Sequence, residues 1–230
     1  MGDEICISCD NIKRGFPTAG QMFWALKGVK LSAERGKLTI LRGRSGSGKT
    51  TLINILGALD YPTEGGVNFG GKDLTRLSEG ARDVIRRERM GFVFQSVALV
   101  SMMTAYENVE FGMRISGRFN SSVSERKKRA ERMLALVGLS QRMKHLPQEL
   151  SGGEQQRVAI ARAIAHNPSI VFADEPTAEL DTNTGLQVVK IFKDLIEAEG
   201  VTVLMTTHDP GFLDIADRVY ELEDGELTDG

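Results

Sequence analysis

The sequence predicts an α/β fold in which a helical region is inserted into a mostly parallel β-sheet core. Short apolar runs rich in β-branched residues alternate with stretches of helical periodicity, the pattern of strands buried on both faces of a parallel sheet. One long internal stretch shows only helical periodicity, which indicates the insertion. With 230 residues, the chain is long enough for one such domain to bury a sizeable core.

The expected strands are residues 38–42, 91–95, 169–173 and 201–208, which read LTILR, GFVFQ, SIVFA and VTVLMTTH. Helices are expected between most of these strands. One covers residues 51–59, and another carries an apolar stripe made of Leu186, Val189, Phe192 and Ile196. Gly200 is the expected C-cap of the second helix.

Residues 96–167 contain helical patterns and no evident strand. One helix there begins with a capping box formed by Ser122 and Glu125 and stops at Gly138. Its basic run at 126–132 is interpreted as a solvated helix face and not as a binding patch. We predict a single domain over residues 1–230, with an α/β core at 1–95 and 168–230 and a helical subdomain at 96–167.

Composition restricts the partners and the compartment. The chain has 29 basic and 31 acidic residues and a formal net charge of -2, which gives no global attraction to nucleic acid. No apolar run approaches the roughly 18 to 20 residues that cross a bilayer. The first ten residues lack the basic-then-apolar plan of a signal peptide. We therefore expect a cytosolic chain with no nucleic-acid partner.

Cys6 and Cys9 form a C-x-x-C pair, a spacing that also occurs in redox and metal sites. A structural zinc site needs four ligands, and the sequence has no second cysteine pair. We interpret both residues as reduced, packed thiols.

A glycine-rich loop at residues 43–51, GRSGSGKTT, matches G-x-x-x-x-G-K-[ST] between an expected strand and an expected helix. Backbone N–H groups of such a loop converge on phosphate oxygens, and the helix that follows adds its positive N-terminal end. Lys49 is placed to reach the β and γ phosphates, and the Thr50 hydroxyl is a candidate Mg²⁺ ligand. The candidate phosphate-binding residues are Gly43, Ser45, Gly46, Ser47, Gly48, Lys49, Thr50 and Thr51.

Two carboxylates end the apolar run IVFADE. Buried strands rarely end in adjacent acids unless those acids have a function. Asp174 is suited to hold Mg²⁺ through its water shell, and Glu175 is suited to polarise the water that attacks a γ-phosphate. The alternative is a pair of solvated carboxylates before Pro176.

A second glycine-rich helix start lies at Ser151-Gly152-Gly153-Glu154. The pattern is a capping box, and a well-capped helix is the simpler interpretation. However, two glycines in a first turn cost about 1 kcal/mol each relative to Ala, and they expose backbone at a positive helix end. This indicates an anion site. One ATP has a single γ-phosphate, and this helix start in the helical subdomain need not reach the nucleotide held by its own core. A second copy of the chain could supply the helix start.

Over nearly its whole length the chain resembles an ABC-type ATPase, the nucleotide-binding subunit of an ABC transporter. GRSGSGKTT resembles the Walker A loop, LSGGEQQ the family signature and IVFADE the Walker B strand. Gln95 resembles the Q-loop glutamine, Asp181 the D-loop aspartate and His208 the switch histidine.

The resemblance implies a P-loop NTPase core, an N-terminal antiparallel β region, and ATP and Mg²⁺ as the bound molecules. It implies a head-to-tail dimer in which Ser151, Gly152 and Gly153 cap the nucleotide held by the other copy, with Asp181 nearby. It also implies that Gln95 acts in catalysis and as a metal ligand. His208 would contact the γ-phosphate, although alone it would be interpreted as a structural histidine.

The aromatic residue that stacks on adenine in the family corresponds in spacing to Phe16. The alternative is that Phe16 is an apolar loop residue without this role, and Phe23 or Trp24 would then be possible substitutes as the stacking residue.

Two functional classes compete within the resemblance. One is a transport or mechanical motor that works on a separate integral membrane permease at the cytoplasmic face of the membrane. The other is a soluble ATPase that acts on ribosomes or DNA. The first is favoured, because the chain has one cassette, no long coiled coil and almost no net charge. Residues 72–113 and 174–185 resemble the branch that serves lipoprotein release, macrolide export and cell division.

In that branch, Gln95 and residues 96–106 would meet a short helix of the membrane subunit. The chain departs from the branch at Ala178-Glu179, where Gly-Asn is common, and at residues 101–103, where a proline is common.

Overall fold

The computed structural model describes residues 4–18, 20–118 and 122–228, which form two sheets and a group of helices. The first sheet has the order β2-β1-β4-β5 and is antiparallel. Its strands are β1 (Ile5–Thr18), β2 (Gln21–Glu34), β4 (Glu64–Phe69) and β5 (Lys72–Asp73). The N-terminal antiparallel region that the resemblance implies is thus confirmed.

The second sheet has the order β10-β9-β3-β8-β7-β6 and is parallel from β9 to β6. Its strands are β3 (Leu38–Arg42), β6 (Met90–Val93), β7 (Ile170–Ala173), β8 (Thr202–Thr207), β9 (Arg218–Glu223) and β10 (Glu226–Thr228). The four expected strands are all present, which confirms the predicted α/β class. β6 ends two residues before Gln95, so this residue lies in the following loop.

The α-helices are α1 (Lys49–Leu56), α2 (Glu79–Arg89), α3 (Ala105–Ser116), α4 (Val123–Leu136), α5 (Gly152–Ala165) and α6 (Thr182–Glu199). Short 3-10 helices are η1 (Leu74–Arg76), η2 (Pro147–Glu149) and η3 (Pro210–Ile215). Gly200 ends α6 in the left-handed conformation with φ 66°, as expected of a C-cap glycine. Ser122 Oγ accepts a hydrogen bond from the Glu125 N–H at 3.2 Å, the N-cap half of the predicted capping box.

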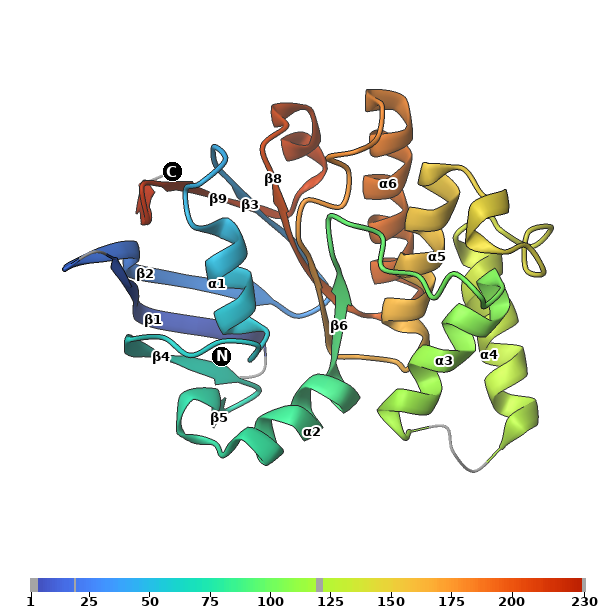
Figure 1. The fold of residues 1–230 in the computed structure, drawn as a ribbon, viewed down its shortest axis with the longest axis horizontal. Helices are drawn as coiled ribbons and strands as arrows, with labels where there is room; N and C mark the ends of the chain where they lie inside the picture. The colour runs from blue at the N-terminus through green and yellow to red at the C-terminus, as the bar shows by residue number, and fades with distance from the viewer. Residues whose placement is uncertain (1–3, 19, 119–121, 229–230) are drawn as a thin grey trace.

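The parallel sheet separates two apolar layers, as its alternating side chains require. Ile170 and Phe172 of β7 face one layer, which holds α1 and the antiparallel sheet. Val171 and Ala173 face the other layer, which holds α3 to α6. Figure 1 shows this arrangement, with α1 and the antiparallel sheet on one side of β3 and β8 and α5 and α6 on the other. The two glycine-led helices, α1 and α5, therefore pack on opposite faces of one sheet.

The region at 96–167 is helical in its described residues, and α5 packs on β6 and α6 as well as on α3 and α4. Its apolar side chains join those of β7 and β8 in one continuous layer. The division into a core and a subdomain at residues 96 and 167 stays a prediction.

The interpretation of the basic run in α4 is wrong for two of its members. Arg126 is 7% exposed and pairs with Glu110 at 3.2 Å. Arg129 pairs with Glu199 and donates to the last carbonyls of α5. Both point inward because the carboxylates and open carbonyls of neighbouring helices compensate their charge. The remaining Lys127, Lys128 and Arg132 are exposed, as expected of a solvated face.

Cys6 and Cys9 are free and buried, in agreement with packed thiols. Burial raises the pKa of both thiols, that of Cys9 to about 12. In the part of the chain that the structure describes, no helix is both long and apolar enough to cross a membrane.

Candidate active site

The glycine-rich loop joins the end of β3 to the start of α1, and its lysine turns back into the loop. Lys49 is 4% exposed, and its Nζ donates to the carbonyl oxygens of Gly43 at 2.8 Å and Arg44 at 3.0 Å. Gly48 adopts φ 106°, and a Cβ there would lie 2.6 Å from the carbonyl oxygen of Ala25. Glycine is therefore required for the tight approach of the loop to β2.

A pocket of about 340 Å³ opens over this loop. It brings together residues from the β1–β2 hairpin, the loop, the segment after β6 and the end of β7. The predicted residues that line it are Phe16, Ser45, Gly46, Gly48, Lys49, Thr50, Thr51, Gln95 and Glu175. Phe23 also lines it, whereas Trp24 does not. A larger groove of about 850 Å³ lies over β1, β2 and β4 and contains none of the predicted residues, so size alone does not identify the site.

Asp174 and Glu175 follow β7 and are held by one hydroxyl group. Thr206 Oγ1 donates to Asp174 Oδ1 at 2.7 Å and accepts from the Glu175 backbone N–H at 2.8 Å. Glu175 has φ 45°, a strained conformation for a residue with a side chain that recurs at functional sites. Thr206 is 0% exposed and was not predicted as a site residue. The only sequence signal for it is a polar residue in an apolar strand.

The Glu175 carboxylate lies between two nitrogen groups. Oε1 is 3.1 Å from Lys49 Nζ, and Oε2 is 2.8 Å from His208 Nδ1. Burial alone would raise the pKa of Glu175, but hydrogen bonds from Lys49 and His208 outweigh burial and lower it below its ordinary value. The carboxylate is therefore ionised at neutral pH. His208 extends from the end of β8 and is 59% exposed.

The second glycine-rich helix start forms the predicted capping box in full. Ser151 Oγ accepts from the Glu154 N–H at 3.2 Å, and Glu154 Oε2 accepts from the Ser151 N–H at 2.9 Å. The two glycines differ in their surroundings. A Cβ at Gly153 would lie 2.6 Å from Thr184 Cγ2, whereas a Cβ at Gly152 would have only an ordinary contact at 3.9 Å. Packing on α6 thus explains Gly153 but not Gly152.

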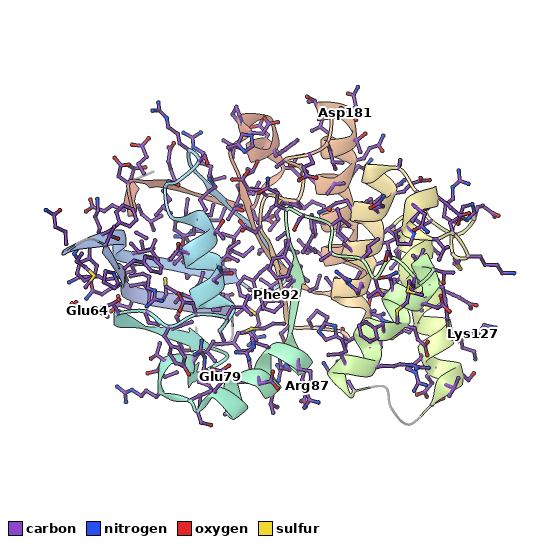
Figure 2. All side chains as sticks on the ribbon, in the orientation of Figure 1. Glu64, Glu79, Arg87, Phe92, Lys127 and Asp181 are labelled. Atoms are coloured by element: carbon purple, nitrogen blue, oxygen red, sulfur yellow. The ribbon has the colours of Figure 1, made fainter. Side chains whose placement is uncertain are left out.

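Ser151, Gly152 and Gly153 do not line the pocket over the glycine-rich loop of the same chain. Asp181 does not line it either, and it lies at the start of α6 (Figure 2). Its carboxylate accepts hydrogen bonds from the backbone N–H groups of Asn183 and Thr184 and from the Thr184 hydroxyl at 2.6 Å. Asp181 is therefore an N-cap in this arrangement.

The loop and its surroundings fit a magnesium-bound triphosphate. Within the described residues, the buried Ser47 Oγ has no hydrogen-bond partner, so this hydroxyl of the loop is available as a donor. Thr50 and Gln95 place a hydroxyl and an amide oxygen on the same pocket, and Asp174 adds a carboxylate next to Glu175. Oxygen donors of this kind suit Mg²⁺.

A phosphate-binding loop with a carboxylate between its lysine and a histidine is the arrangement of a nucleoside triphosphate hydrolase. Comparison with known proteins agrees. The ABC transporter family matches residues 26–178. An ABC transporter ATP-binding protein of Methanocaldococcus jannaschii is 46% identical over 205 residues, 89% of this chain and 90% of that protein. The macrolide export ATP-binding/permease protein MacB of Bradyrhizobium diazoefficiens is 45% identical over 96% of this chain, which spans only 33% of MacB.

Among solved structures, a dimeric post-hydrolysis state of the ATP-binding cassette MJ0796 bound to ADP and Pi superposes with a TM-score of 0.88. It is 40% identical and covers 97% of both chains. The chain belongs to the ABC transporter family, and it is an ATP-binding, ATP-hydrolysing cassette of that family. The fold class and the activity predicted from the sequence are confirmed.

Proposed function

We propose that this cassette hydrolyses MgATP between two copies of itself and drives a separate membrane-spanning permease from the cytoplasmic face. The observation that carries the catalytic part is the Glu175 carboxylate, which lies between Lys49 and His208 in the pocket over the glycine-rich loop.

The loop would hold the phosphates. Its backbone N–H groups and the start of α1 attract the anionic oxygens, and Ser47 Oγ and Lys49 Nζ add two donors. Lys49 is placed between two backbone carbonyls and Glu175, all of which are acceptors. A phosphate oxygen would replace some of these acceptors and leave Glu175 free to accept a different proton.

Glu175 would act as the general base. A water held between its carboxylate and the γ-phosphorus forms the new P–O bond while one of its protons moves to Glu175. The bond from the γ-phosphorus to the bridging oxygen breaks, and ADP keeps that oxygen. His208, 2.8 Å from Glu175 Oε2, orients the carboxylate and contacts the γ-phosphate. Thr50, Gln95 and Asp174 would hold a bound Mg²⁺, which would supply positive charge to offset the charge of the phosphates.

A second copy would complete the site. α1 and α5 pack on opposite faces of one sheet, and the Ser151 helix start does not line the pocket over the glycine-rich loop, so we expect it to cap a phosphate held by the other copy. Gly152 has no packing reason in this chain, which is consistent with contact to a γ-phosphate on a partner copy. The dimeric state of the related cassette MJ0796 supports this arrangement. Asp181 would lie at the same junction.

The membrane partner is inferred from the relatives. MacB is named as an ATP-binding and permease protein, and this chain spans only 33% of one MacB and 34% of another. We infer that an integral membrane permease subunit receives the movement through Gln95 and residues 96–106. The absence of a nucleic-acid partner stays a prediction from the net charge of -2.

The test compares the wild type with Glu175→Gln. The variant should keep ATP binding but lose turnover by about 10²-fold or more, because an amide cannot accept the proton. Light scattering after size exclusion should show a monomer without nucleotide and a dimer with MgATP. Wild-type turnover in the variant would remove Glu175 from its role, and a monomer at saturating MgATP would contradict the two-copy site.

A further inference from the structure

The ring of Phe16 is covered on one face by a positively charged side chain. The guanidinium carbon of Arg14, two residues earlier on β1, lies 4.7 Å from the ring centroid. The same guanidinium is anchored by Asp60, with Nη2 at 3.0 Å from Oδ1 and 2.9 Å from Oδ2. Asp60, Arg14 and Phe16 thus form one continuous row of contacts.

The segment that contains Asp60 also fixes the backbone of this strand. The Thr63 N–H donates to the Lys13 carbonyl at 2.7 Å, and the Gly15 N–H donates to Thr63 Oγ1 at 3.0 Å. Glu64, labelled beside the β1–β2 hairpin in Figure 2, pairs with Lys13 at 2.7 Å. This segment follows α1, whose first turn begins in the glycine-rich loop. The placement of the Phe16 ring is therefore tied to the element that would hold the phosphates.

The uncovered part of the ring belongs to the pocket. Phe16 pairs with Phe23 across the hairpin, and both line the pocket with Ser45, Gly46 and Lys49. Phe16 is 37% exposed and Phe23 is 59% exposed, so both offer aromatic surface to a flat ligand. A base attached to phosphates on the loop would stack here.

We propose that Arg14 is a positioning residue for the nucleotide base: anchored by Asp60, it holds the Phe16 ring in the orientation that stacks on the base. This inference rests on the proposed nucleotide-binding function. Rotation about the last side-chain torsion of Phe is soft, and a guanidinium packed on one face restricts it. The Arg14 side chain is 24% exposed, and its Nε is buried without a hydrogen-bond partner among the residues that the structure describes. An arginine that served only the ion pair with Asp60 would not need to cover the ring and bear the free-energy cost of a buried, unpaired Nε.

The experiment measures binding of two probes by calorimetry, Mg-ADP and Mg-pyrophosphate, because only the first has a base. Arg14→Ala should weaken Mg-ADP by about threefold to tenfold, the range of one aromatic contact, and leave Mg-pyrophosphate unchanged. Arg14→Lys keeps a charge for Asp60 but loses the flat group, so it should weaken Mg-ADP by a smaller factor. Lys13→Ala is the matched control on the same strand, and it removes only an exposed ion pair.

Three results would overturn the inference. Arg14→Ala could bind Mg-ADP like the wild type, both probes could weaken equally, or Lys13→Ala could have the same effect as Arg14→Ala. Equal weakening of both probes would indicate a general disturbance of the loop. The proposed function fails separately, if the wild type binds neither probe. Arg14→Lys keeps the test decisive should Arg14→Ala fold poorly.

Discussion

Thr206 offers the sharpest test of how the fold prepares the two carboxylates. Its hydroxyl makes two hydrogen bonds in a fully buried position, one to the Asp174 carboxylate and one from the Glu175 backbone N–H. Thr206→Val preserves the shape of the side chain but removes both hydrogen bonds. A hydrogen bond to a charged group contributes about 1.5–3 kcal/mol and a neutral one about 0.5–1.5 kcal/mol. We expect Thr206→Val to lower the free energy of unfolding by about 3 kcal/mol.

Thermal unfolding measures this loss. For a chain of this size, 1 kcal/mol corresponds to roughly 2–4 °C, so Tm should fall by roughly 6–12 °C. ATP turnover should fall more than tenfold, because the φ 45° backbone of Glu175 loses the hydroxyl that holds it. Thr206→Ser retains the hydroxyl and should recover most of the turnover.

Thr39→Val is the matched control. Thr39 lies on β3, the strand paired with β8, and is 1% exposed. In the described part of the chain, its hydroxyl has no hydrogen-bond partner. Valine there should leave the stability unchanged or raise it. The reasoning is refuted if Thr206→Val and Thr39→Val have the same Tm and both keep wild-type turnover.

Three further predictions concern α5, the helix that begins at Gly152. Gly152→Ala should not lower Tm, because its Cβ has room 3.9 Å from Leu180 and alanine favours the helix. The same variant should nevertheless abolish the MgATP-dependent dimer that light scattering detects. Gly153→Ala should lower Tm, because its Cβ would be 2.6 Å from Thr184. A dimer retained by Gly152→Ala would contradict its phosphate-capping role. At the other end of α5, burial lowers the pKa of His166 to about 4. Between pH 6.5 and 4 the unfolded chain therefore binds more protons than the folded chain, so Tm should fall as the pH falls. His166→Gln should flatten this decline between pH 6.5 and 5, and an unchanged slope would show that other groups cause it.

Much of the local structure could be predicted from the sequence. β3 occupies the expected residues 38–42, and the capping box at Ser151 and Glu154 forms with both of its hydrogen bonds. Gly200 ends α6 where the apolar stripe ends. These features follow from signals within one turn or one strand, where periodicity and capping chemistry determine the conformation. The phosphate-binding loop likewise follows from a signal within a few neighbouring residues.

Other parts of the site carry no local signal. Thr206 has no motif of its own, and it reaches Asp174 because β7 and β8 are neighbours in the sheet. Arg126 and Arg129 read as a solvated face, because the sequence does not reveal which carboxylates the neighbouring helices bring to them.

The sequence by itself determined the phosphate-binding loop, the paired carboxylates, the second glycine-rich helix start and membership of the family, since each depends on residues close together in the chain. Only the tertiary structure decided that Lys49 and His208 meet on Glu175, that Asp60 anchors Arg14 over Phe16, and that α1 and α5 lie on opposite faces of the sheet. The physical reason is that strand order and layer packing come from burying apolar surface across the whole domain, and distant residues become neighbours only as a result.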